Sequence, residues 1–218
     1  LHSFPTRRSS DLFRWQTSTR GRGPMQDNPV LSFLAERRSV LARNMSGPGP
    51  DRAMLETLLS IAMRVPDHGK LTPWRLVVVQ DDDRIELGDI ASRELAAANA
   101  EPEEVEAARA QFLRAPCVVA VLACPRAHPK IPRSEQLYSA GAVCMMLVTA
   151  ARAAGFAAQW LTGAAAYNGD VLSRLGGGAD DEIAGFIYLG SCAEKPTERA
   201  RPNFADIACF GLPDTSST

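Results

Sequence analysis

Two adjacent arginines and a serine near the start of the chain carry side chains suited to holding an anion. Arg37, Arg38 and Ser39 come at the end of a predicted helix over residues 29–37. Two guanidinium forks and a hydroxyl match the oxygens of a phosphate group. The same arginines could instead only complement the negative end of the helix dipole. The residues alone leave both interpretations open.

A second polar segment, residues 64–75, interrupts apolar sequence on both sides. It contains Arg64, His68 and Lys70 together with two prolines and a glycine. This composition predicts a loop, and loops beside a core often carry function. Arg64 could also be a helix-end charge and His68 an ordinary hydrogen-bonding group, while Trp74 is expected to belong to the core.

The sequence offers no set of residues typical of a metal site or a catalytic nucleophile. The three histidines are too few and too widely spaced for a zinc site. Five cysteines occur without a Cys-x-x-Cys pair, mostly in apolar runs, so we expect them to be reduced and buried. Because no Ser-His-Asp set or paired carboxylate stands out, we expect no catalytic side chain and no metal.

Composition predicts one domain with a sizeable core. The chain has 218 residues, of which 45% are hydrophobic. A net charge of −1 and an aromatic content of 6% argue against nucleic acid as a partner. No segment predicts a membrane span, and the expected reduced cysteines favour the cytoplasm.

The element at the centre of the predicted fold is the uncharged stretch from Ser139 to Ala151. It is apolar on every face, which predicts a buried helix, and Gly155 is expected to end it. Residues 156–162 then predict a short buried strand. A buried helix followed by such a strand could form a wall for a planar cofactor.

The remaining elements are predicted from periodicity and turn residues. Asp51 is expected to cap a helix ending near Met63. Two alanine-rich, charged helices over 85–98 and 103–114 predict a peripheral excursion or lid. The other predicted elements are strands 76–80, 117–124 and 183–189, a short helix 171–175 and an apolar tail 203–212. An apolar tail beyond the last core strand is expected to be buried by a partner subunit.

The first 24 residues are expected to be a non-native or disordered extension. Residues 1–12 are similar to a translated sequencing-adapter remnant, and residues 13–24 have the arginine-rich, acid-poor composition of a transit peptide. Met25 is therefore the expected start of the natural chain, and residues 25–218 the expected domain.

Four blocks taken together resemble the nitroreductase family of flavin enzymes, in its small YdjA-like subgroup. They are residues 37–39, 64–75, 135–163 and 185–190, within a similarity that runs from about residue 29 to 212. The resemblance implies an α+β fold: a three-layer α/β/α sandwich with a mainly antiparallel sheet, in an intertwined homodimer. It also implies two FMN sites at the subunit interface, each built from both chains.

The resemblance further implies an FMN-dependent NAD(P)H oxidoreductase that reduces nitro or quinone-like compounds by ping-pong hydride transfer. The implied FMN contacts are Arg37, Arg38, Ser39, Arg64, His68, Trp160, Leu161 and Thr162. The implied nicotinamide-nucleotide region is Ala150, Ala151, Arg152, Ala153, Ala154 and Gly155. Three alternatives stay open: a flavin-binding or storage dimer without turnover, another flavin reduction such as dehalogenation, and a structural dimer without a cofactor.

Two departures from the family pattern concern the implied flavin environment. Asp67, His68 and Lys70 stand where larger family members have serines and an asparagine. Leu161 stands where close relatives have arginine. Substrate preference therefore cannot be inferred from the resemblance.

Overall fold

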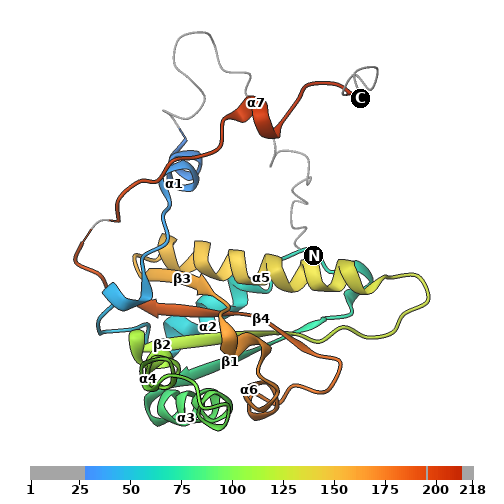
Figure 1. Ribbon diagram of the computed structural model, residues 1–218. Coiled ribbons are helices and arrows are strands. Elements are labelled where there is room, and N and C mark those ends of the chain that lie inside the picture. Colours follow the sequence, from blue (N-terminus) through green and yellow to red (C-terminus); the bar gives the residue numbers. More distant parts are fainter. Residues whose placement is uncertain (1–27, 195, 213–218) are drawn as a thin grey trace, which may run out of the picture. The chain divides into compact units, whose positions relative to one another are not determined.

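The computed structural model describes residues 28–194 and 196–212 (Figure 1). The chain divides into two units, residues 1–37 and 38–218. In the first unit the described part is helix α1, Pro29–Glu36, whose N-cap residue Asn28 accepts hydrogen bonds from two backbone N–H groups. The expected first helix is thus confirmed. The expected extension over residues 1–24 lies outside the described residues.

A four-stranded antiparallel sheet is the core of the second unit. In the order β1-β2-β4-β3, its strands are Trp74–Gln80, Cys117–Ala123, Glu182–Gly190 and Ala157–Leu161. Every residue of the central strand β2 is buried, as its uninterrupted apolar sequence predicts. The expectation that the strand near 156–162 is buried is wrong in part, because β3 is an edge strand and Trp160 is 38% exposed.

Helices α2 (Arg52–Ala62) and α5 (Arg133–Ala153) cover one face of the sheet. Asp51 caps α2 by accepting a hydrogen bond from the backbone N–H of Met54 at 2.8 Å. Leu58 of α2 and Leu147 of α5 pack in one buried cluster with residues of β2 and β4. The apolar stripe predicted for α2 therefore faces the sheet.

Helices α3 (Asp81–Ala97) and α6 (Gly169–Arg174) cover the other face, with α4 (Pro102–Ala110) packed on α3. The prediction of a peripheral excursion is wrong for α3, since Leu87 and Ile90 join the core cluster that contains the Phe112–Phe186 ring contact. Gly88 allows this packing, because a Cβ there would lie 2.0 Å from the Arg109 carbonyl oxygen. The predicted three-layer sandwich is confirmed.

The four short 3₁₀ helices connect these layers. They are η1 (Ala42–Asn44), η2 (His68–Lys70), η3 (Gln111–Arg114) and η4 (Ala164–Tyr167). The tail carries one further helical turn, α7 (Phe204–Ile207), whose residues are exposed. None of the helices in the described part of the chain combines the length and hydrophobicity that a membrane span requires.

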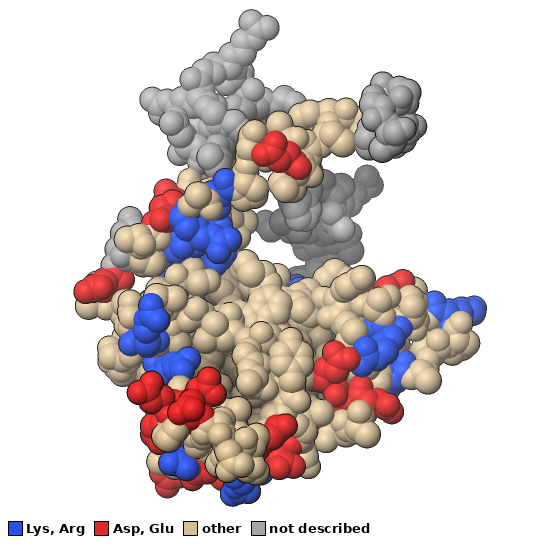
Figure 2. All heavy atoms as spheres, in the orientation of Figure 1, with Lys and Arg blue, Asp and Glu red and all other residues tan. Residues whose placement is uncertain are grey.

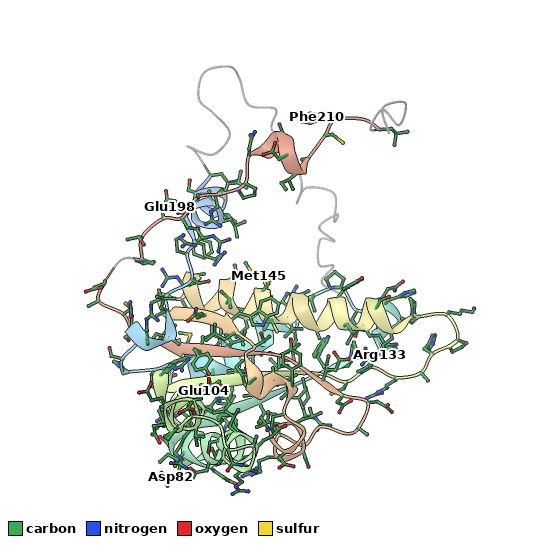
Figure 3. The ribbon with its side chains drawn as sticks, in the orientation of Figure 1. Asp82, Glu104, Arg133, Met145, Glu198 and Phe210 are labelled. Carbon is green, nitrogen blue, oxygen red and sulfur yellow. The ribbon has the colours of Figure 1, made fainter. Side chains whose placement is uncertain are left out.

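Helix α5 leaves one apolar face uncovered, so the expectation that it is buried on every side is wrong. Tyr138 is 74% exposed and Met145 is 40% exposed. With Ala142 and Thr149 they follow the spacing of one helix face. Figure 3 shows Met145 on the side of α5 that points away from the sheet. An exposed apolar face of this kind is typical of a surface that contacts another molecule.

Candidate functional site

The segment that carries Arg38 and Ser39 lies beside the edge strand β3. The backbone N–H of Val40 donates a hydrogen bond to the carbonyl oxygen of Ala158 at 3.1 Å. This pairing fixes the direction in which the chain passes the strand. Two of the predicted phosphate-binding residues are therefore held next to the predicted flavin-contact strand, although more than a hundred residues separate them in the sequence.

Arg38 is held by the segment that follows β4. Its Nε donates to the carbonyl oxygen of Thr197 at 3.2 Å and lies 3.5 Å from a carboxylate oxygen of Glu198. The backbone N–H of Arg199, together with nearby arginine charges, lowers the pKa of the Glu198 carboxyl group. No acceptor among the described residues occupies the terminal NH₂ groups of Arg38, so these donors remain available to an anion.

Of the two neighbours of Arg38, Ser39 belongs to the same unit and Arg37 to the other. Ser39 is exposed, and its hydroxyl has no partner within the described ranges. Arg37 ends the first unit, where its backbone N–H donates to the Phe33 carbonyl oxygen at 2.8 Å. A role for Arg37 in the same site stays a prediction.

Trp160 forms a flat surface at the exposed end of the sheet. Its indole Nε1 donates a hydrogen bond to the Ala184 carbonyl oxygen at 3.1 Å. The ring occupies the place of a side chain at Gly185, where an added Cβ would lie 2.0 Å from Nε1. The ring thus has a fixed orientation while remaining partly open to solvent. Figure 2 shows a largely uncharged surface over β3 and the middle of α5.

The chain turns sharply after β3 and leaves two backbone N–H groups without an acceptor among the described residues. Gly163 adopts a φ of 68°, a conformation that glycine takes at little cost, and η4 follows. Within the part of the chain that the structure describes, the N–H groups of Thr162 and Gly163 have no acceptor. Leu161 is half-buried and packs on the opposite face of β3 from Trp160. The strand end therefore presents an aromatic surface with adjacent N–H donors.

The polar loop predicted over residues 64–75 is fastened to α5 by one buried hydroxyl. Ser139 Oγ donates to the Pro66 carbonyl oxygen at 2.7 Å and accepts from the Trp74 indole Nε1 at 3.1 Å. The Asp67 carboxylate accepts two backbone N–H bonds from further along the loop, at 3.0 and 2.9 Å. Asp67 therefore stabilises the loop itself, and Ser139 is a site residue that the sequence prediction missed.

His68 is oriented by a carboxylate of α5. Its Nδ1 lies 2.7 Å from Glu135 Oε2. Because a carboxylate only accepts, Nδ1 carries the proton of this bond and Nε2 faces away from it. Arg64 is exposed and has no side-chain partner among the described residues. The sequence prediction also missed Glu135 as the partner of His68, since 67 residues separate the pair.

The predicted FMN contacts of the second unit fall into two groups within one chain. The β3 group comprises Arg38, Ser39, Trp160, Leu161 and Thr162, and the loop group comprises Arg64 and His68. The loop group meets α5 at Glu135, whereas the Trp160 ring approaches α5 at Gly141, 3.9 Å from the position of a Cβ there. At about 100° per residue, these positions flank the open face that carries Tyr138 and Met145.

The predicted nicotinamide-nucleotide segment forms the C-terminal end of α5. The backbone N–H of Phe156 donates to the Ala151 carbonyl oxygen at 3.0 Å, and Gly155 has a φ of 89°. These are the features of a glycine-terminated helix. Arg152 donates to the Phe156 carbonyl oxygen at 2.9 Å, while its buried Nε has no partner among the described residues. A nucleotide role for this segment stays a prediction.

The described residues contain no cluster of histidine, cysteine and acidic side chains that could hold a metal ion. The cysteines are free thiols, but the expectation that they are buried is wrong in part, because Cys124 and Cys192 are half-buried and Cys209 is exposed. Burial raises the pKa of both Cys117 and Cys144 to about 12, and that of Cys124 to about 11. Thiols with such pKa values stay protonated near neutral pH and are poor nucleophiles.

Comparisons with known proteins identify the family of this fold. The Nitroreductase family model matches residues 34–191, and the chain belongs to the nitroreductase family. It is 34% identical over 162 residues to the "Putative NAD(P)H nitroreductase YdjA" of Escherichia coli (strain K12), covering 74% of this chain and 87% of that protein. A "Putative NAD(P)H nitroreductase" of Haemophilus influenzae is 29% identical over 175 residues, 79% of this chain and 93% of that protein.

Two solved structures share the fold at low sequence identity. A nitroreductase-like family protein from Bacillus cereus has a TM-score of 0.72 and 22% identity, covering 84% of this chain and 96% of its own. A nitroreductase from Desulfovibrio desulfuricans in complex with FMN has a TM-score of 0.65 and 20% identity, covering 86% of this chain and 99% of its own. At these identities the likeness establishes the fold alone.

Proposed function

We propose that this chain binds FMN and uses NAD(P)H to reduce nitro compounds or other electron-poor acceptors such as quinones, in a ping-pong cycle. The observation that carries the proposal is the β3 group: the segment with the donors of Arg38 and Ser39 pairs with β3 at Ala158, and the Trp160 ring projects from the same strand over β4. Family membership supports it, as do the names of the relatives and the FMN bound to a protein of the same fold.

The residues present fit the two chemically different ends of FMN. Arg38 and Ser39 would hold the phosphate, because guanidinium and hydroxyl donors form charge-assisted hydrogen bonds to it. The N–H groups of Thr162 and Gly163 would bind the polar edge of the ring system. Glu198 is a nearby negative charge that would repel the FMN phosphate. It is exposed and lies on the Nε side of Arg38, so solvent screens this repulsion.

The chain's own side chains would orient the cofactor and set the charge around it. Bound FMN supplies the acceptor and donor of hydride in such a reaction. Arg64 and Lys70 are exposed cations on the fastened loop, and a cation near the ring favours the electron-rich reduced cofactor. Glu135 keeps His68 in one orientation, so that its Nε2 can contact the cofactor or substrate.

A homodimer would complete this site. The loop group and the β3 group flank the open face of α5, so pairing two copies through that face would bring the loop group of one copy toward the β3 group of the other. The tail also has apolar side chains to bury, since Phe204, Ile207, Phe210 and Leu212 are 64–98% exposed. Both features support the intertwined dimer implied by the family resemblance.

The proposal is tested by anaerobic mixing of the FMN-loaded protein with NADH and with NADPH. At least one nucleotide should bleach the flavin absorbance, and a nitroaromatic or quinone should then restore it in the absence of NAD(P)H. A flavin that neither nucleotide bleaches would contradict the proposal and favour a flavin-storage role. Bleaching that no nitro or quinone acceptor reverses would contradict the proposed acceptor class.

A further inference from the structure

A cavity of about 330 Å³ opens on the opposite face of β3 from Trp160. Its lining residues are Leu41, Ala42, Arg43, Arg114, Gln159 and Leu161. Successive side chains of a strand point to opposite faces, so Gln159 and Leu161 face this cavity while Trp160 faces α5. The cavity therefore adjoins the β3 group without containing its anion-binding residues Arg38 and Ser39.

Two arginines give this cavity an uncompensated positive charge. Arg43 belongs to η1 and Arg114 ends η3, and these two short helices lie against each other. None of the lining residues is acidic, and neither guanidinium has an ion-pair or hydrogen-bond partner within the described ranges. Arg114 also acts on the buried Tyr188, whose pKa burial raises to about 12 while the arginine charge works to lower it.

The remaining polar group of the cavity is also a donor. Gln159 Oε1 accepts a hydrogen bond from the backbone N–H of Ala42, so the amide NH₂ group is left to donate. All three polar side chains that line the cavity can thus donate to one ligand. Leu41 and Leu161 add apolar wall beside them.

We propose that this cavity is a phosphomonoester-binding site separate from the FMN-phosphate contacts at Arg38 and Ser39. Two guanidinium groups match the double negative charge of a phosphomonoester. The volume lies at the lower end of the range for ligand pockets, which suits a phosphate and the group attached to it. The bound phosphate is either inorganic phosphate or a phosphate group of a nucleotide, such as the 2′-phosphate of NADPH. The assignment to NADPH rests on the proposed function.

The test is isothermal titration of the FMN-saturated full chain with inorganic phosphate, 2′-AMP and adenosine. We expect 2′-AMP to bind and adenosine not to bind, with affinity falling as salt rises. Arg43→Gln and Arg114→Gln should each weaken phosphate binding at least roughly tenfold, as expected for the loss of a charge-assisted hydrogen bond. Arg93→Gln, which removes an exposed charge from α3 outside the cavity, should leave binding unchanged.

The outcomes of these titrations test the cavity site independently of the proposed FMN-dependent activity. Binding of inorganic phosphate but not 2′-AMP would support the site and exclude a nucleotide source. If the parent chain binds NADPH more tightly than NADH, and Arg114→Gln removes this difference in affinity, the 2′-phosphate is identified as the ligand. Absence of binding by both phosphate probes would overturn the proposal, even if NAD(P)H bleaches the flavin. Loss of FMN from the Arg43 or Arg114 variants would overturn the claim of a separate site.

Discussion

The indole ring of Trp160 occupies the space that a side chain at Gly185 would fill on the neighbouring strand. An ideal Cβ at position 185 would lie 2.0 Å from the indole Nε1, which donates a hydrogen bond to Ala184. The glycine therefore determines how the aromatic ring lies at the end of β3. Because that ring forms the proposed flavin wall, the geometry of the site depends on a residue without a side chain.

Replacing Gly185 with alanine should displace this ring. We expect Gly185→Ala to lower the free energy of unfolding by about 1–3 kcal/mol, the range for overpacking a core, and to weaken FMN binding. Urea unfolding and tryptophan fluorescence measure the two effects. Gly169→Ala is the matched control, because nothing lies within 4 Å of a Cβ at that position. Equal stability of the two variants would contradict the described packing.

Arg38 should contribute to FMN affinity far more than to folding. Arg38→Ala removes the guanidinium proposed to bind the phosphate, and the expected loss is roughly 10- to 100-fold in the dissociation constant. Glu198→Gln is the control, since it removes the neighbouring carboxylate while leaving the arginine in place. FMN titration followed by fluorescence measures both. If Glu198→Gln weakens binding as much as Arg38→Ala, the phosphate assignment is wrong.

The hydroxyl of Ser139 should stabilise the loop that carries Arg64 and His68. Ser139→Ala leaves the Trp74 indole N–H and the Pro66 carbonyl oxygen without their partner, which should cost about 1–3 kcal/mol. Hydrogen exchange should become faster in residues 64–73. Ser60→Ala removes a hydroxyl that bonds only within its own helix, and should change little. Unchanged exchange in Ser139→Ala would show that this hydroxyl does not hold the loop.

Local sequence signals predicted individual elements, whereas the three-layer arrangement was predicted from the family resemblance. Asp51 is a strong N-cap residue, Gly155 ends α5, and the apolar run of β2 indicates a strand buried on both faces. The helix over α3 was misjudged because its apolar stripe is narrow, and its burial depends on the close approach of α4 at Gly88. Such tertiary contacts leave no periodic signal in the sequence.

The candidate site was predictable only in part, for a related reason. Arg38 and β3 were proposed from residue type and family resemblance, and the structure places them side by side. The partners that orient them were not predicted, since Ser139, Glu135 and Gly185 are ordinary residues until distant segments pack against them. The exposure of Met145 was also missed, because a sequence does not show which apolar face a second chain would cover.

A charge placed on the open face of α5 should break the proposed dimer. Met145 is 40% exposed in the single chain, and Met145→Glu would bury a carboxylate in the expected interface. We expect the dissociation constant of the dimer to rise at least tenfold by sedimentation analysis. Thr57→Glu adds the same charge to an exposed position of α2 and should not change it. An unaffected dimer in Met145→Glu would exclude this face as the interface.

Stability should fall at alkaline pH because two thiols are buried. Burial raises the pKa of Cys117 and Cys144 from an ordinary value of 9.0 to about 12. Between these values the folded chain keeps protons that the unfolded chain has lost, so rising pH favours unfolding by about 1.4 kcal/mol per unit for each thiol. Urea unfolding should show a shallower decline above pH 9 in Cys144→Ala. Identical slopes in parent and variant would contradict the assigned burial effect.

The central claim is that the β3 group and the loop group hold a flavin nucleotide. The most direct measurement is a titration of the flavin-free, demonstrably folded protein with FMN, followed by quenching of flavin fluorescence. The account predicts saturation at one FMN per chain, with riboflavin, which lacks the phosphate, binding more weakly. A folded dimer that binds no FMN, or binds riboflavin equally well, would contradict it.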